Sequence, residues 1–407
     1  MITTEGDRIR FTGPSGYDVL PAASALHRLI TRQGYSDITL DFSAATFLTP
    51  SFMVPLVTLA RAYRSENADF EIIFPTETKA AKIIRNANWA HIISPERYES
   101  LEGLNKQHLS AVQYRNAQDH YRVVDQSLSF ALQSTKGLDR NHLKALEWAL
   151  NEVTDNVLNH AESPVGGILQ MTAYPSKQVI EFYVCDAGLS IPRTLRVGRP
   201  ELMDDVRALR AAVEEGVTRN KSTNQGNGLY GAFKCCEVSG GQFEILSGNV
   251  SLKHWPGTLN ASRNNTYFRG TLVRARINIA FEKLLERALI FKGQPHDPSF
   301  DFVERLYQPE GDDINFVVKN ELDALGSREA GKLARTKIEN LMNNATIGIL
   351  FDFDGVHLIS SSFADEVFGR LFLEYGPVRF GQLVKFKNID ATVQRLIDRA
   401  IALRMRV

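Results

Sequence analysis

The sequence has few cysteines, no net charge and no long apolar segment. Its 407 residues include three cysteines, none in a C-x-x-C pair, which argues against a disulfide framework or a zinc site. Lys and Arg balance Asp and Glu at 47 each, which argues against a strongly basic protein that binds nucleic acid or a membrane surface. The longest aliphatic runs, such as residues 347–353, have strand length, and residues 1–16 lack the apolar core of a secretory signal. We therefore expect a cytoplasmic protein without a membrane span.

Hydrophobic periodicity predicts an α/β (α+β) protein with three segments. Residues 37–42 and 70–75 have strand patterns, whereas residues 51–64 and 78–89 have helix patterns. Longer helices follow from about residue 104, and a stretch rich in Pro, Gly and Asp at 291–301 is typical of a linker. Beyond it, the strand patterns at 346–353 and 382–388 alternate with the helix patterns at 362–376 and 391–405. The predicted domains are 1–103, 104–289 and 298–407.

The first and last segments contain similar twelve-residue stretches. DFSAATFLTPSF starts at Asp41 and DFDGVHLISSSF starts at Asp352. In register they share the Asp-Phe pair, an aliphatic residue, a hydroxyl and a closing Ser-Phe, and both lie between a predicted strand and a predicted helix. We interpret this agreement as one fold used twice, on either side of a different middle domain.

A polar row on a predicted helix draws attention to the middle segment. LEWALNEVTDNVLNHA, starting at Leu146, has an apolar stripe of helical spacing. Beside that stripe Glu152, Asn156 and His160 are spaced four apart, so they share a neighbouring face. Alone, the row is better explained as the solvated side of an amphipathic helix, because such faces are common.

Two glycine-containing stretches follow in order. A β-rich run ends at Asp186 and Gly188, a pattern that also fits an ordinary turn. A carboxylate at a strand end can accept a hydrogen bond from an exocyclic amine, and glycine lets the backbone approach a flat ring. Gly226, Gly228 and Gly231 then open a helix, an arrangement whose backbone amides favour phosphate. A polar stretch precedes these glycines instead of a strand, so the dinucleotide-fold version of this motif is rejected.

Taken together, the motifs resemble those of the GHKL, or Bergerat-fold, ATPases. NEVTDNVLNHA resembles the family's N box, and DAGLSI, GNGLYG and RGT resemble its three glycine boxes, in order over about residues 120–285. Ser190 stands where the family often has a second glycine. The resemblance implies a central Bergerat-type α/β sandwich that binds ATP and Mg²⁺.

The resemblance also implies a role for each matching residue. Asn156 would ligate Mg²⁺, and Glu152 would orient or deprotonate the attacking nucleophile. Asp186 would hold the adenine amino group, with Gly188 beneath the ring and Thr271 supporting a nearby water. Gly226, Gly228 and Gly231 would wrap the phosphates. Arg219 and Lys221 lie where the family has its lid and would reach the γ-phosphate, or are solvated loop charges, while His160 would pin the helix. Mg²⁺ prefers hard oxygen ligands and keeps several waters, so one amide oxygen is sufficient from the protein.

The terminal segments resemble the STAS domains of anti-anti-sigma factors and a related STAS-like family. In the anti-anti-sigma proteins a serine of the strand-to-helix turn is phosphorylated by a GHKL serine kinase, and Ser51 and Ser362 fall at that position. Either serine also suits a helix N-cap, and SFAD from Ser362 has the form of a capping box. Pro50 replaces the first serine of the family motif in the N-terminal copy.

Two functions remain open. One is an ATPase or serine kinase that uses Mg²⁺ and acts in bacterial signal transduction through its STAS-like domains. The other is a nucleotide-gated interaction protein with little or no catalysis. Glu152 favours the enzyme, but the same carboxylate serves either water or a serine hydroxyl as nucleophile. For partners, we expect ATP, a protein bound through the STAS-like domains and homo-oligomerisation as an option. No specific nucleic acid is indicated.

Overall fold

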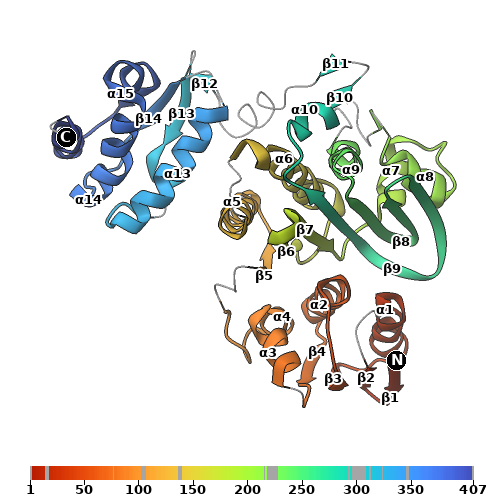
Figure 1. The fold of residues 1–407 in the computed structure, drawn as a ribbon. Coiled ribbons are helices and arrows are strands. Elements are labelled where there is room, and N and C mark those ends of the chain that lie inside the picture. The colour runs from red at the N-terminus through yellow and green to blue at the C-terminus, as the bar shows by residue number, and fades with distance from the viewer. Residues whose placement is uncertain are drawn as a thin grey trace. The chain divides into compact units, whose positions relative to one another are not determined.

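A computed structural model shows a mixed α/β fold in two compact units, Met1–His296 and Asp297–Val407 (Figure 1). It describes residues 2–13, 18–76, 78–101, 107–135, 140–214, 216–217, 228–291, 294–295, 309–310, 313–322, 324–344 and 348–405. The predicted α+β class is thus confirmed. None of the helices in those ranges is long and apolar enough to cross a membrane.

The first unit begins with a four-stranded sheet in the order β1-β2-β3-β4. The β1–β2 pair is antiparallel, while β2–β3 and β3–β4 are parallel, so helices must connect the parallel strands. The elements are β1 (Ile2–Glu5), β2 (Arg8–Gly13), α1 (Val19–His27), η1 (Arg28–Arg32), β3 (Asp37–Ala45), α2 (Pro50–Ser65), β4 (Asp69–Ile73), α3 (Thr78–Asn86) and α4 (Trp89–Ile93). The predicted strands at 37–42 and 70–75 and the helix at 51–64 are confirmed.

A second sheet follows within the same unit, with five antiparallel strands in the order β5-β6-β7-β9-β8. Its elements are β5 (His108–Tyr114), α5 (Ala117–Ser134), α6 (Arg140–Asn156), η2 (Val157–Ala161), β6 (Gly167–Tyr174), η3 (Pro175–Lys177), β7 (Val179–Asp186), α7 (Ile191–Gly198), α8 (Asp205–Ala211), α9 (Gly228–Val238), β8 (Gln242–Trp255), β9 (Thr258–Asn278), α10 (Leu284–Ala288), β10 (Ile290–Phe291) and β11 (Gln294–Pro295).

Both faces of this second sheet are buried. Along β7, Ile180, Phe182 and Val184 point to one face and pack in a core with α5, α6 and α9. Tyr183 and Cys185 point to the opposite face and join the core of the N-terminal sheet instead. This division follows from the two-residue period of a strand.

Helix α2 fills the space between the two sheets. It contacts β4 of its own sheet and β6 and β7 of the second. Residues 52–60 are all buried, as expected of a helix that is apolar all round. A hydrogen bond of 2.8 Å from Trp89 Nε1 in α4 to the buried Gln170 Oε1 in β6 adds a polar link. The N-terminal sheet and the central sheet therefore share one continuous core.

The β8–β9 hairpin coils back over α9. Phe243, near the start of β8, and His254, near its end, both pack against Phe233, with ring centroids 5.9 Å and 5.2 Å apart. A straight strand would separate Phe243 and His254 by more than 30 Å, since each residue rises about 3.3 Å. The coiling therefore brings both ends of β8 against Phe233 of α9.

The second unit repeats the topology of the N-terminal sheet. Its strand order is β12-β13-β14-β15, again one antiparallel pair followed by two parallel pairs. Its elements are β12 (Pro309–Glu310), β13 (Asp313–Val317), α12 (Val318–Glu321), α13 (Arg328–Asn344), β14 (Gly348–Asp352), α14 (Ser361–Ala364), η4 (Asp365–Gly369), α15 (Arg370–Leu383), β15 (Val384–Lys387) and α16 (Ala391–Arg404).

The two similar sequence stretches occupy the same place in the two sheets. Asp41 and Asp352 lie in β3 and β14, and each carboxylate accepts a hydrogen bond from the backbone two residues on, from Ser43 at 2.9 Å and Asp354 at 3.0 Å. The prediction of one fold used twice agrees with this shared topology.

Candidate functional site

The polar row predicted on one helix lies along α6 and its extension. Leu146, Leu150 and Val153 are buried, which confirms the apolar stripe. Glu152 and Asn156 are half-buried beside it. Asn156 ends α6, and η2, a π-helix of five residues, begins directly after it, so the helix continues to Ala161 with altered spacing. Such π-turns are frequent at functional sites.

Asp186 ends β7 with its carboxylate almost wholly buried, at 3% exposed. Its Oδ1 atom accepts a hydrogen bond of 2.8 Å from the Gly188 N–H. Burial raises the pKa of Asp186 to about 7, against the lowering effect of the backbone amides of Gly188 and Thr271. A buried carboxyl whose pKa lies near neutrality can serve either as an acceptor or, once protonated, as a donor.

Thr271 lies directly opposite Asp186 on β9. Its hydroxyl is 2.8 Å from the Ser247 Oγ atom, and that oxygen also accepts a 2.8 Å hydrogen bond from the Ile191 N–H at the start of α7. The predicted residues Asp186 and Thr271 are thus brought together, and Ser247 was missed. No pattern in the sequence distinguishes Ser247, since its contact with Thr271 depends on strand register.

Gly188 joins the end of β7 to the end of the α6–η2 helix. A Cβ atom at Gly188 would overlap the Ala161 carbonyl oxygen, so no larger residue fits this backbone. The same carbonyl accepts a hydrogen bond of 2.6 Å from the Leu189 N–H. The turn after Asp186 is therefore seated on the helix that carries Glu152 and Asn156.

The glycines of α9 bring the third motif against the same helix. A Cβ atom at Gly228 would overlap Glu152 Oε2, and one at Gly231 would overlap the Trp148 ring. Close approach of α9 and α6 therefore requires glycine at Gly231, against the Trp148 ring, whereas at Gly228 a shift of the flexible Glu152 carboxylate would make room. Gly226, with the lid residues Arg219 and Lys221, lies outside the described residues.

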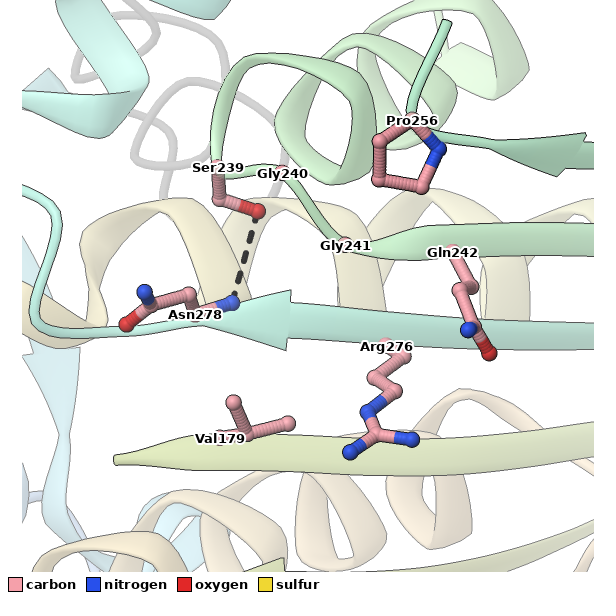
Figure 2. Close-up of a pocket in the computed structure, with 8 residues that line it drawn as sticks. All are labelled: Val179, Ser239, Gly240, Gly241, Gln242, Pro256, Arg276 and Asn278. Carbon is pink, nitrogen blue, oxygen red and sulfur yellow. Dashed lines mark hydrogen bonds between the residues drawn. The ribbon is translucent and has the colours of Figure 1, made fainter. Parts of the chain in front are cut away.

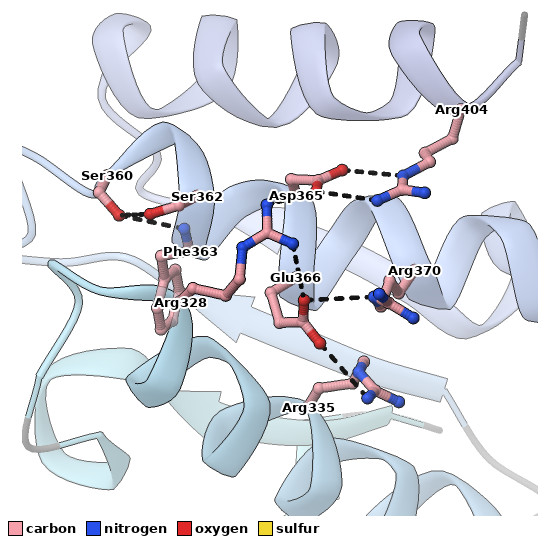
Figure 3. Close-up of polar contacts among 9 residues, drawn as sticks. All are labelled: Arg328, Arg335, Ser360, Ser362, Phe363, Asp365, Glu366, Arg370 and Arg404. Carbon is pink, nitrogen blue, oxygen red and sulfur yellow. Dashed lines mark hydrogen bonds and ion pairs between the residues drawn. The ribbon is translucent and has the colours of Figure 1, made fainter.

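The serine turns differ in detail from the prediction. In the second unit Ser360 is the N-cap, since its Oγ accepts a hydrogen bond of 3.0 Å from the Phe363 N–H (Figure 3). The capping box predicted to start at Ser362 is therefore wrong by two residues, because the helix already begins at Ser361. Ser362 Oγ instead lies 3.0 Å from Ser360 Oγ.

The N-terminal turn has the same hydroxyl pair. Thr49 Oγ1 lies 2.9 Å from Ser51 Oγ, and Ser51 is exposed. Thr49 is the N-cap residue of α2 but makes no side-chain cap hydrogen bond, so the capping role predicted for Ser51 is not seen. Both predicted serines thus share one setting, with a hydroxyl partner two residues before each.

Beside Ser362, charged side chains tie together three helices of the second unit (Figure 3). Glu366, only 1% exposed, lies 3.2 Å from Arg370 and 3.5 Å from both Arg328 and Arg335. Asp365 forms two 2.9 Å hydrogen bonds with Arg404, which lower the pKa of that carboxyl. Since a buried carboxylate is stable only when paired, these ion pairs hold η4 to α13 and α16.

A cavity of about 250 Å³ lies at the other end of the central sheet (Figure 2). Its lining includes Val179, the first residue of β7, whereas Asp186 is the last. The remaining lining residues are Ser239, Gly240, Gly241, Gln242, Pro256, Arg276 and Asn278. Because Val179 and Asp186 lie at opposite ends of β7, the cavity is separate from the candidate site. None of its lining residues was predicted from the sequence.

The comparison with protein families bears on the second unit. Residues 330–394 match the model of the STAS-like domain of unknown function (DUF4325). The matched stretch runs from α13 into α16 and includes the turn with Ser360 and Ser362. No curated protein matches the chain. The chain therefore contains a STAS-like domain, as predicted for its C-terminal end, and this match does not extend to the central sheet.

Proposed function

We propose that this chain is a Mg²⁺-dependent ATP-binding signalling protein of the GHKL type, whose STAS-like domains contact a protein partner. One observation carries the proposal. The described parts of four separate sequence motifs meet at one end of the central sheet: Glu152 against Gly228, Gly188 against the helix end after Asn156, and Asp186 opposite Thr271.

The buried carboxylate of Asp186 fits an adenine ring. An exocyclic amine is a neutral donor, so it satisfies a buried carboxylate without adding a second buried charge. Gly188 packs its backbone against the Ala161 carbonyl, which holds the turn beside that carboxylate in place. Asp186 would hold the amine, and the hydroxyl pair of Thr271 and Ser247 would hold a water next to the ring.

Glu152 and Asn156 fit the phosphate end of the same ligand. Asn156 would supply an amide oxygen to Mg²⁺, and the metal would neutralise charge on the phosphates. Gly226, Gly228 and Gly231 would present backbone amides at the start of α9. Glu152, whose carboxylate lies against Gly228, would orient the attacking oxygen.

The position of Glu152 favours an enzyme over a nucleotide-gated sensor. A carboxylate beside the phosphates weakens nucleotide binding, because like charges repel at close range, so its presence there favours a chemical task. Hydrolysis and transfer to a serine both remain within this proposal, and Ser51 and Ser362 are the candidate acceptors.

The test uses the full chain, Mg²⁺ and ATP labelled at the γ-phosphate, with free phosphate and protein-bound label both followed. Glu152→Gln should bind nucleotide at least as tightly as the wild type but lose turnover about 100-fold or more. Asp186→Asn should lose binding. Glu147→Gln, five residues before Glu152 on α6, is the matched control and should reduce neither turnover nor nucleotide binding.

Each product pattern has a distinct meaning. Label that disappears in Ser51→Ala or Ser362→Ala would identify a serine kinase acting on its own STAS-like domains. Free phosphate alone would identify an ATPase. Binding without either product would support the nucleotide-gated sensor, and no binding of ATP or ADP would overturn the whole proposal.

A further inference from the structure

Arg269, which immediately precedes Gly270 and Thr271 on β9, connects two domains. Its guanidinium forms a two-pronged ion pair with Glu66, with Nη1–Oε2 at 3.0 Å and Nη2–Oε1 at 2.6 Å. Its Nε atom donates a hydrogen bond of 3.0 Å to the Ala187 carbonyl oxygen. One side chain therefore contacts both the N-terminal STAS-like fold and the turn after Asp186.

The contact to Ala187 acts on the candidate nucleotide site through a single peptide unit. The carbonyl of Ala187 and the N–H of Gly188 belong to the same planar peptide. Its oxygen accepts from Arg269, and its N–H donates 2.8 Å to Asp186 Oδ1. Any rotation of this peptide would break both hydrogen bonds together. Arg269 thus fixes the peptide that orients the Asp186 carboxylate.

Gly270 brings β9 close enough for this contact. Its φ is +90°, and a Cβ atom there would overlap the Asp186 carbonyl oxygen. Only glycine accepts this backbone without strain and leaves room for the turn. Strand β9 therefore packs directly against the turn after Asp186, which Arg269 orients.

Glu66 is the residue that caps the C-terminal end of α2. The guanidinium of Arg269 also lies over the ring of Tyr63, one turn earlier on α2, with 5.6 Å to the ring centroid. Hydrogen bonding by Glu66 raises the pKa of Arg269. Because Glu66 is 46% exposed, this pair adds little stability by itself, but its fork geometry fixes the direction of the guanidinium.

We propose that Glu66 and Arg269 are positioning residues that make nucleotide affinity depend on the position of the C-terminal end of α2. This inference rests on the proposed function, since it names the regulation of that same site. A partner or a modification that shifts the C-terminal end of α2 would release Arg269, free the 187–188 peptide and weaken the hold on the adenine amine. Coupling of this kind is reciprocal, so bound nucleotide would also secure α2.

The test compares two side-chain changes with a matched control. Glu66→Gln removes the ion pair, and Arg269→Lys removes both the fork and the Nε donor. Glu96→Gln is the control, because Glu96 is 49% exposed and pairs with Arg64 at 2.6 Å, within the N-terminal sheet domain and without contact to the turn. Affinity for ADP and ATP is measured in the full chain, together with hydrogen exchange of residues 186–190 in the absence of nucleotide.

Glu66→Gln should weaken nucleotide binding about fivefold, and Arg269→Lys tenfold or more, as expected for the loss of charge-assisted hydrogen bonds. Both should speed amide exchange at Gly188 and Leu189. The charge-swapped double variant Glu66→Arg with Arg269→Glu should keep thermal stability close to that of the wild type but not recover affinity, because a glutamate cannot donate to the Ala187 carbonyl.

The outcomes separate this inference from the proposed function. Equal affinity and equal exchange in Glu66→Gln and Glu96→Gln would overturn it, as would full recovery of affinity in the charge-swapped variant. If the wild type binds no nucleotide, the proposed function fails, while faster exchange of the turn in Arg269→Lys would still support the positioning role. If the wild type binds no nucleotide and amide exchange of the turn is also unchanged in Arg269→Lys, both the proposed function and the positioning role are overturned.

Discussion

Replacing Asp186 with asparagine tests the energetics of the candidate site directly. Burial raises the pKa of this carboxyl from its ordinary value of 3.8 to about 7. The free energy needed to ionise it in the folded chain therefore exceeds that in the unfolded chain by about 4 kcal/mol, at about 1.4 kcal/mol per pH unit. At pH 8 the wild type carries this penalty in full.

The sign of the pH dependence follows from proton binding. Between about pH 4 and pH 7 the folded chain holds a proton on Asp186 that the unfolded chain has released, so the free energy of unfolding falls as pH rises. Above pH 7 both states are ionised and the slope from this group disappears. In Asp186→Asn the free energy of unfolding should not show this decrease between about pH 4 and pH 7.

Asparagine retains an oxygen that can accept from the Gly188 N–H, but its amide nitrogen would face the Thr271 N–H. We therefore expect about half of the full gain, on the order of 2 kcal/mol of added stability at pH 8 and little change at pH 4. The assay is chemical denaturation of the full chain at both pH values, following the transition of the first unit.

Asp41→Asn provides a control of opposite sign in the same unit. Burial alone would raise the pKa of Asp41, but hydrogen bonds from Ser43 and the charges of Arg10 and Arg8 lower it overall. Asp41→Asn should therefore lose stability at pH 8. If Asp186→Asn is likewise destabilised at pH 8, with a smaller loss at pH 4, the carboxylate is stabilised as an anion and the reasoning is refuted.

Two further changes test packing and capping. His254 is 3% exposed, and neither ring nitrogen has a hydrogen-bond partner in the described part of the chain, so His254→Leu should raise the free energy of unfolding by about 1–3 kcal/mol. His91→Leu, which removes a 2.7 Å contact to the Tyr98 carbonyl oxygen, should lower it, and a loss in both variants would contradict this account. Ser360→Ala should destabilise the second unit by about 1 kcal/mol through loss of the cap, measured by denaturation. Ser362→Ala should cost less, and the reverse order would show that Ser362 is the effective cap.

Much of the local structure could be predicted because it is encoded locally. The four-residue spacing of Glu152 and Asn156 and the apolar stripe beside them define one helix and its buried side. The strand before Asp186 and the helix opened by Gly228 follow from similar short-range patterns. The resemblance of these motifs, in their order, to the GHKL boxes grouped them, and their contacts in the fold agree with that grouping.

What the sequence could not supply was contact between distant residues. Glu66 and Arg269 lie 203 positions apart and become partners only because α2 packs against the central sheet. The sequence does predict that this helix is buried, since residues 52–60 are apolar on all sides. The pattern does not indicate which surface the helix packs against. The error at Ser362 has another source, because three consecutive serines offer equally good caps and the helix boundary decides among them.

The double burial of α2 has a consequence for dissecting the protein. A fragment ending near residue 103 would expose one side of α2, and one starting near residue 104 would expose Tyr183, Cys185 and Phe268 on the bare face of the sheet. Apolar surfaces of that kind promote aggregation and chaperone capture. Expression trials should therefore keep residues 1–296 as one piece. A transplant of the nucleotide site into another scaffold would need α2 as well as the glycine motifs.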